Sequence, residues 1–193
     1  DYDVMIMPSG SYGEVFDDEG QRSLKSWISG GGTLIAVDGA NRFLAGLDGF
    51  SLTRKSAENE DEGVDPIDKL KKYGNVERDF ISDLNAGSIY ELTMDTTHPL
   101  AFGYGEQYMS LKLGSTVYDY MENGWNVGVA KSGEPRSGFV GANVQKSLEH
   151  SLSFGVEEMG SGEVIYLIDN PFFRGFWHNG KLLIGNAVFF LGN

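Results

Sequence analysis

Val4-Met5-Ile6-Met7-Pro8-Ser9-Gly10 and Thr33-Leu34-Ile35-Ala36-Val37 are the two stretches that decide the fold class. Each contains a short apolar run, and turn-forming residues adjoin them, which is typical of buried strands. Residues 19–29 lie between them and repeat apolar side chains at helical spacing, so a helix is predicted there. A strand, a helix and a second strand within about 35 residues form a βαβ unit, whose strands are parallel and whose crossover is right-handed. The chain is therefore predicted to be an α/β protein.

The rest of the chain is predicted to extend this sheet. A second short helix is expected near Asn41. Short strands separated by Gly or Asn favour an antiparallel extension at one sheet edge; they are expected at 88–92, 109–113, 126–130 and 138–141. Residues 152–157 and 163–168 flank a glycine-rich turn and predict a hairpin, and an apolar helix is expected over 181–191.

Residues 51–85 interrupt this pattern with a polar segment, which we interpret as an insertion within a single domain spanning 1–193. A helix is expected within it at 66–73. Its acidic run, 58–62, lacks the alternating oxygen ligands and central glycine of a calcium loop, so a solvated loop is favoured.

Composition narrows the class of partner. The 193 residues carry 15 basic and 28 acidic side chains, and a net charge of −13 disfavours nucleic acid and anionic membrane surfaces as partners. The chain has no cysteine, which excludes thiol catalysis and thiolate metal sites. No apolar run is long enough to cross a bilayer. The sequence starts at Asp1 without an initiator methionine or signal peptide, so we expect it to be a fragment of a longer chain.

Candidate site residues follow the predicted strands, because ligands of open α/β sheets bind beyond the carboxyl ends of parallel strands. The polar side chains in these loops are Asp38, Asn41, Arg42, His98, Glu106, Asp169, Arg174 and His178. Each also has a structural interpretation. Asp38 and Asp169 are of a type that often caps helices or turns, His98 precedes a proline as turn residues do, and His178 is placed to cap the last helix. Arg174 is placed to pair with a carboxylate, and the aromatic residues at 172–177 are expected in a core or an interface.

No catalytic or metal motif occurs in the sequence. His-Glu-x-x-His and paired-histidine spacings are absent, as are Gly-x-Gly-x-x-Gly, the Walker pattern and Gly-x-Ser-x-Gly. We therefore expect no metal, no cofactor and no catalytic residue of these classes in this chain.

Two segments of the N-terminal part, 2–10 and 27–36, resemble the class I glutamine amidotransferase-like fold. The resemblance implies a three-layer, flavodoxin-like domain with a mostly parallel sheet and an antiparallel edge extension. It places Asp38 where that family has its nucleophilic cysteine, and it places Asn170-Pro171-Phe172 near the family's histidine-proline-glutamate segment. Since an aspartate cannot form the thioester, the domain is expected not to be a glutaminase.

Later segments resemble the C-terminal region of bacterial zinc carboxypeptidase-like proteins. They are Thr97-His98-Pro99-Leu100-Ala101-Phe102-Gly103-Tyr104, Gly162-Glu163-Val164-Ile165, and 169–177 with Asn186-Ala187. This resemblance implies a non-catalytic accessory domain of a secreted or periplasmic metallocarboxypeptidase. Its partner would be the upstream peptidase domain, which would hold the zinc, or a second copy in a homo-oligomer.

Two alternatives remain open. The segment His98-Pro99 to Gly103, followed by Glu106-Gln107-Tyr108, is also similar to trehalose-utilisation proteins. That similarity implies a module that binds a sugar or polyol in a crevice beside Asp38, His98 and Trp177. The other alternative is an enzyme that uses Asp38 or His98 by an unrelated mechanism, which requires a cleft with perturbed carboxylates.

Overall fold

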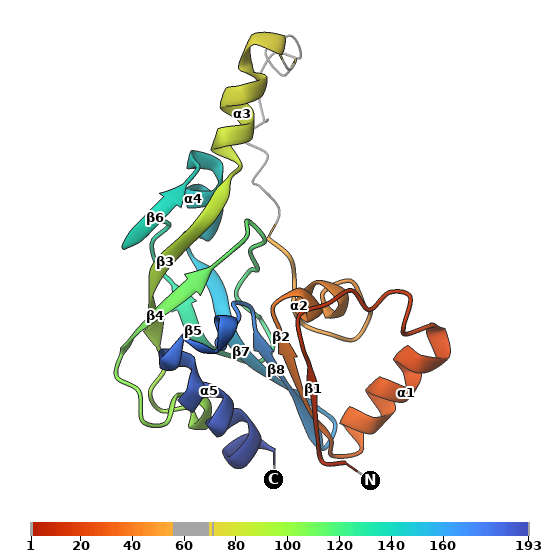
Figure 1. Ribbon diagram of the computed structural model, residues 1–193. Coiled ribbons are helices and arrows are strands. Elements are labelled where there is room, and N and C mark those ends of the chain that lie inside the picture. Colours follow the sequence, from red (N-terminus) through yellow and green to blue (C-terminus); the bar gives the residue numbers. More distant parts are fainter. Residues whose placement is uncertain (1, 56–69, 71, 193) are drawn as a thin grey trace.

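Three parallel strands form one edge of the sheet in the computed structural model, which describes residues 2–55, 70 and 72–192 (Figure 1). β1 (Val4–Met7), β2 (Thr33–Val37) and β8 (Gly162–Leu167) pair in that order. The crossover from β1 to β2 is α1 (Asp18–Ser29), which begins after Asp17, whose carboxylate accepts a hydrogen bond from the Gly20 N–H. The predicted βαβ unit is confirmed.

The sheet continues from β8 with strands that are all antiparallel to their neighbours. The order is β8, β7 (Ser151–Met159), β5 (Trp125–Ala130), β3 (Asn85–Met94) and β4 (Gln107–Lys112), and β6 (Ser137–Val140) also pairs with β3. The predicted antiparallel extension is therefore present, but the prediction that most of the sheet is parallel was wrong, because among the described strands only β1, β2 and β8 pair in parallel. Parallel neighbours need a long crossover connection, and between β3 and β8 the chain mostly returns through turns instead.

Apolar side chains pack on both faces of the sheet. In β2, Leu34 and Ala36 belong to the core under α1 and α2 (Gly39–Leu44). Ile35 and Val37 belong to the core under α5 (Lys181–Asn186) and the π-helix at Ala187–Leu191. A strand buried on both faces reads as a continuous apolar run, which is why the sequence identified it. The result is a mixed α/β domain with helices on both sides of a curled sheet (Figure 1).

Two helices occur where none was predicted. α4 (Ala142–Leu148) leads into β7, and α3 (Val76–Ser82) follows a 3-10 turn at Tyr73–Asn75. The helix predicted at 66–73 and the acidic run at 58–62 lie largely or wholly outside the described residues. The predicted β7–β8 hairpin and the helical C-terminal segment are confirmed. Further 3-10 turns lie at Pro99–Ala101, Phe173–Gly175 and His178–Gly180.

The β7–β8 hairpin places two carboxylates opposite one another. Glu158 and Glu163 are direct cross-strand partners, and Glu158 is exposed while Glu163 is partly buried. Oε1 of Glu163 is buried and has no hydrogen-bond partner within the described part of the chain. Burial, and then the charge of Glu158, raise the pKa of Glu163 to about 7.

Among the described residues, no helix has the length and apolar character needed to cross a bilayer.

Candidate functional site

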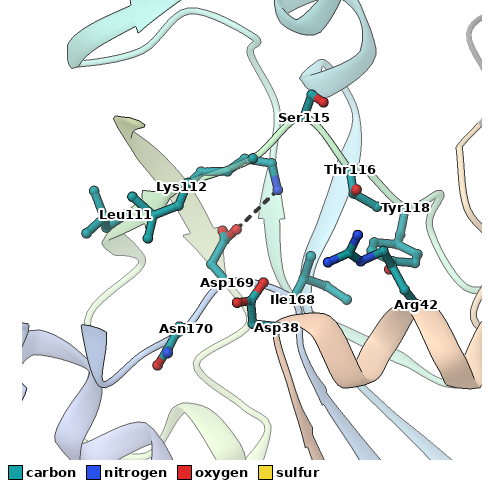
Figure 2. A pocket seen from close by; sticks show the side chains of 12 residues that line it. Asp38, Arg42, Leu111, Lys112, Ser115, Thr116, Tyr118, Ile168, Asp169 and Asn170 are labelled. Carbon is teal, nitrogen blue, oxygen red and sulfur yellow. Dashed lines mark hydrogen bonds and ion pairs between the residues drawn. The ribbon is translucent and has the colours of Figure 1, made fainter. Parts of the chain in front are cut away.

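A cavity of about 370 Å³ lies at the carboxyl ends of the parallel strands β2 and β8 (Figure 2). Three chain segments, each following a strand, supply its lining: the ends of β2, β4 and β8. Its polar lining residues include Asp38, Arg42, Lys112, Tyr118, Asp169 and Asn170. β4 reaches this edge because it runs in the same direction as β8, and the curl of the sheet brings its end back over β8 (Figure 1).

Asp38 forms a sharp elbow between β2 and α2. Its backbone has φ 48° and ψ −111°, a conformation that costs free energy for a residue other than glycine. The Asp38 N–H donates to the Leu167 carbonyl at 2.8 Å, which fixes the elbow to β8. The next residue is glycine because a Cβ on Gly39 would lie 3.0 Å from the Gly10 nitrogen and the Ser9 hydroxyl.

Asn41 lies beneath the elbow and is fully buried. Its Nδ2 lies within hydrogen-bond distance of three backbone carbonyls, those of Leu167 at 2.9 Å, Asp38 at 3.1 Å and Ala36 at 3.4 Å. A buried amide that joins β2, β8 and the elbow stabilises the strained turn through these additional hydrogen bonds. The structure therefore places Asn41 as a support of the site and not on its surface.

The Asp38 carboxylate is exposed at the cavity and accepts a hydrogen bond from the Ser9 hydroxyl at 2.8 Å. It makes no side-chain bond to the N-terminus of α2, so the interpretation of Asp38 as a helix cap is wrong. Arg42, one turn further along α2, is also exposed and lines the same cavity. Asp38 and Arg42 thus present a negative and a positive group to one small volume (Figure 2).

Asp169 and Lys112 form a buried ion pair at the cavity floor, with Nζ and Oδ1 3.1 Å apart and each side chain 7% exposed. The second oxygen of Asp169 accepts a hydrogen bond from the Ser110 hydroxyl at 2.9 Å. Asp169 is therefore tied to β4 and does not cap a turn, contrary to that interpretation. Burial of two charges is tolerated because they satisfy one another.

Tyr118 forms one wall of the cavity and is 2% exposed. It lies in a segment held by isolated bridges to Arg54 on one side and Leu152 on the other. Its hydroxyl is buried and has no hydrogen-bond partner among the described residues. Burial raises the pKa of Tyr118 to about 12, so the hydroxyl stays protonated and available as a donor.

Sequence reasoning did not single out Lys112, Ser110 or Tyr118. The alternation in β4 conceals the first two, because its buried phase is Tyr108, Ser110 and Lys112, whereas the apolar residues Met109 and Leu111 are only partly buried. Once buried, Ser110 and Lys112 need polar partners, and Asp169 supplies them. For Tyr118 the sequence carries no signal either, since its wall position depends on long-range pairing.

His98 and Glu106 lie at the other end of the strands, toward the amino end of β8. β3 runs antiparallel to β5 and β4, so the loop that joins β3 to β4 is remote from the carboxyl ends of β2 and β8. His98 Nδ1 accepts a hydrogen bond from the Leu100 N–H, which confirms its interpretation as a turn residue. Burial lowers the pKa of His98, and the charge of Asp95 opposes this. The expected convergence of these two residues with Asp38 is wrong.

Arg174 and His178 are exposed and do not line the cavity. The Arg174 guanidinium lies over the Phe173 ring, 5.2 Å from its centre, and pairs with no carboxylate in the described structure. Their segment instead runs along the edge strand, where Asn179 Nδ2 donates to the Met109 carbonyl of β4. Trp177 is likewise outside the cavity lining, so the aromatic wall is Tyr118.

Within the described ranges, no three His, Asp or Glu side chains are grouped as a metal site requires.

Comparison with known proteins supports the fold through structure alone. No protein family and no curated protein matches the sequence. Among solved structures, a ThuA-like protein from Parabacteroides merdae aligns with a TM-score of 0.58 and 16% identity, over 100% of this chain and 71% of that one. A ThuA-like protein from Bacteroides uniformis aligns at 0.50 and 12% identity, over 96% and 67%. A cytoplasmic protein of Salmonella typhimurium aligns at 0.50 and 15%, over 98% and 72%.

The fold is like that of ThuA-like proteins. At these identities the likeness to ThuA-like proteins concerns the arrangement of the chain and not its chemistry.

Proposed function

We propose that the cavity binds a small hydroxyl-rich ligand, a sugar or polyol, and that the domain is a carbohydrate-binding module. The observation that carries the proposal is the convergence of the Asp38 carboxylate and the Arg42 guanidinium on one volume. Hydroxyl groups both donate and accept hydrogen bonds, and a site with acceptors and donors on facing walls matches them. A volume of about 370 Å³ suits a ligand with one sugar ring or an open chain of similar size.

The structural neighbours support the same class of ligand. ThuA-like is the name used for trehalose-utilisation proteins, and two of the aligned structures carry it. This agrees with the carbohydrate alternative from the sequence, although the residues differ from that expectation. Asp38 is common to both, while Tyr118 takes the place expected for Trp177.

The test is a calorimetric titration of the protein with a panel of sugars and polyols that includes trehalose, glucose, sorbitol and their acidic derivatives. We expect at least one to bind, and Asp38→Asn to weaken that binding by tenfold or more, since a hydrogen bond to a charged acceptor contributes about 1.5–3 kcal/mol. Asp48→Asn, at an exposed aspartate outside the cavity, is the matched control. Absence of heat across the whole panel would exclude the proposal.

The accessory role in a secreted or periplasmic zinc carboxypeptidase is a separate proposal. It concerns sequence upstream of Asp1, with the peptidase domain as partner. Reading the gene upstream tests it: a domain with a His-x-x-Glu pair and a later histidine would support it, and a sugar-processing domain would refute it.

A further inference from the structure

One unneutralised arginine, Arg42, lines the cavity, and a second arginine lies beside Tyr118 outside the lining, in a strongly acidic chain. Arg42 comes from α2, and Arg54 is the bridge partner of Tyr118, so its side chain lies on the same side of that pairing as the Tyr118 ring. Both guanidinium groups act on the Tyr118 hydroxyl and oppose the rise of its pKa. Two arginines around one buried tyrosine contrast with the net charge of −13 for the whole chain.

The guanidinium groups of these two arginines have no hydrogen-bond or ion-pair partner among the described residues, and both side chains are exposed. Lys112, by contrast, is neutralised by Asp169. Arg42 therefore offers a free planar fork of donors to a ligand in the cavity.

The Tyr118 hydroxyl is a second, independent sign of a missing partner. It is a buried donor that no described group satisfies, on a residue that lines the cavity. Buried polar groups without a partner are rare in folded proteins and cost free energy. The Arg42 side chain lies beside the Tyr118 ring (Figure 2), and because it is exposed and unpaired it can turn toward a ligand and uncover the hydroxyl.

We propose, resting on the proposed function, that the ligand is a sugar acid: a hydroxylated molecule whose single carboxylate binds Arg42 and Tyr118 while its hydroxyl groups face Asp38. Figure 2 shows Arg42 and Tyr118 on one side of the cavity, Asn170 on the other, and Asp38 between them. A carboxylate matches the guanidinium fork with two parallel hydrogen bonds.

A carboxylate is favoured over a phosphate by the charge of the opposite wall. A phosphate monoester carries about −1.5 to −2 at neutral pH, whereas a carboxylate carries −1. Asp38 is exposed at the same cavity, and it would repel the higher charge more strongly.

The experiment compares matched ligands by calorimetry on the full chain: gluconate against sorbitol, glucuronate against glucose, and glucose 6-phosphate as the phosphate arm. We expect each acid to bind at least tenfold more tightly than its neutral partner, and more tightly than the phosphate. Arg42→Met keeps the apolar stem and removes the charge; it should weaken binding of each acid at least tenfold more than binding of its neutral partner, so that the preference for acids is lost. Arg22→Met, at an exposed arginine of α1, is the control and should retain the preference.

Tyr118→Phe gives a readout that does not depend on Arg42. Since the hydroxyl has no partner in the described structure, its removal should raise the melting temperature of the free protein yet weaken binding of the acid about tenfold. Equal binding of acids and neutral ligands, or an unchanged preference in Arg42→Met, would overturn the sugar-acid assignment and leave the proposed function in place. Tighter binding of the phosphate would also overturn it. No binding by any ligand would refute the proposed function itself, and this assignment with it.

Discussion

Glu163→Gln should stabilise the protein at neutral and alkaline pH. The pKa of Glu163 is raised from its ordinary 4.5 to about 7, first by burial and then by Glu158. A carboxyl with a raised pKa binds its proton more tightly in the folded state, so folding stability falls as pH rises from about 4.5 to about 7. At about 1.4 kcal/mol for each tenfold change in proton affinity, the upper bound is about 3.4 kcal/mol. Partial exposure of the side chain reduces this to roughly 1–2 kcal/mol.

Urea unfolding between pH 4 and pH 8 measures the effect. The free energy of unfolding of the wild type should fall by roughly 1–2 kcal/mol relative to Glu163→Gln across the window, and the two should converge near pH 4. Glu158→Gln removes the neighbouring negative charge, and it should raise the free energy of unfolding at neutral pH by less than Glu163→Gln does. Glu122→Gln, at an exposed glutamate, should follow the wild-type profile. A constant difference between wild type and Glu163→Gln at every pH would refute the reasoning.

Three further substitutions test the architecture of the site. Asn41→Ala should lower the free energy of unfolding by roughly 1–3 kcal/mol in urea titrations, because the Leu167 and Asp38 carbonyls each lose one of their two donors; an unchanged midpoint would contradict its supporting role. Gly39→Ala should cost about 1–3 kcal/mol and weaken ligand binding, because the new methyl group meets Ser9 at 3.0 Å; calorimetry on the folded variant checks the second effect. Lys112→Met should cost about 3–5 kcal/mol by leaving Asp169 buried and unpaired, and Lys112→Met/Asp169→Leu should recover most of it in a double-mutant cycle. Additive single effects would show that the pair is not coupled.

Local pattern in the sequence was sufficient for the elements that are buried on both faces or joined by short turns. β1, α1 and β2 carry their own periodicity, and the β7–β8 hairpin carries its own turn. α4 was not recognised because its seven residues bury only Val144 and Leu148, too few to show a helical period.

The candidate site was predictable only where parallel strands build it. Asp38, Arg42 and Asp169 follow β2 and β8, and the rule that such ends meet placed them together. The same rule failed for His98 and Glu106, because β3 is antiparallel to its neighbours, and its carboxyl end therefore lies at the opposite end of the strands from the cavity. Strand direction is decided by pairings between residues far apart in the chain, which no local window contains.

The cavity is assembled from residues 38–42, 111–118 and 168–170, which span most of the chain. No subset of the strands can form it, so a ligand bound there stabilises only the completely folded state. When the free ligand concentration is one hundred times the dissociation constant, binding would add about 2.7 kcal/mol to the free energy of unfolding. Backbone amides of β2, β4 and β8 should then share the same slowing of hydrogen exchange wherever exchange requires global unfolding, although the ligand touches only the strand ends.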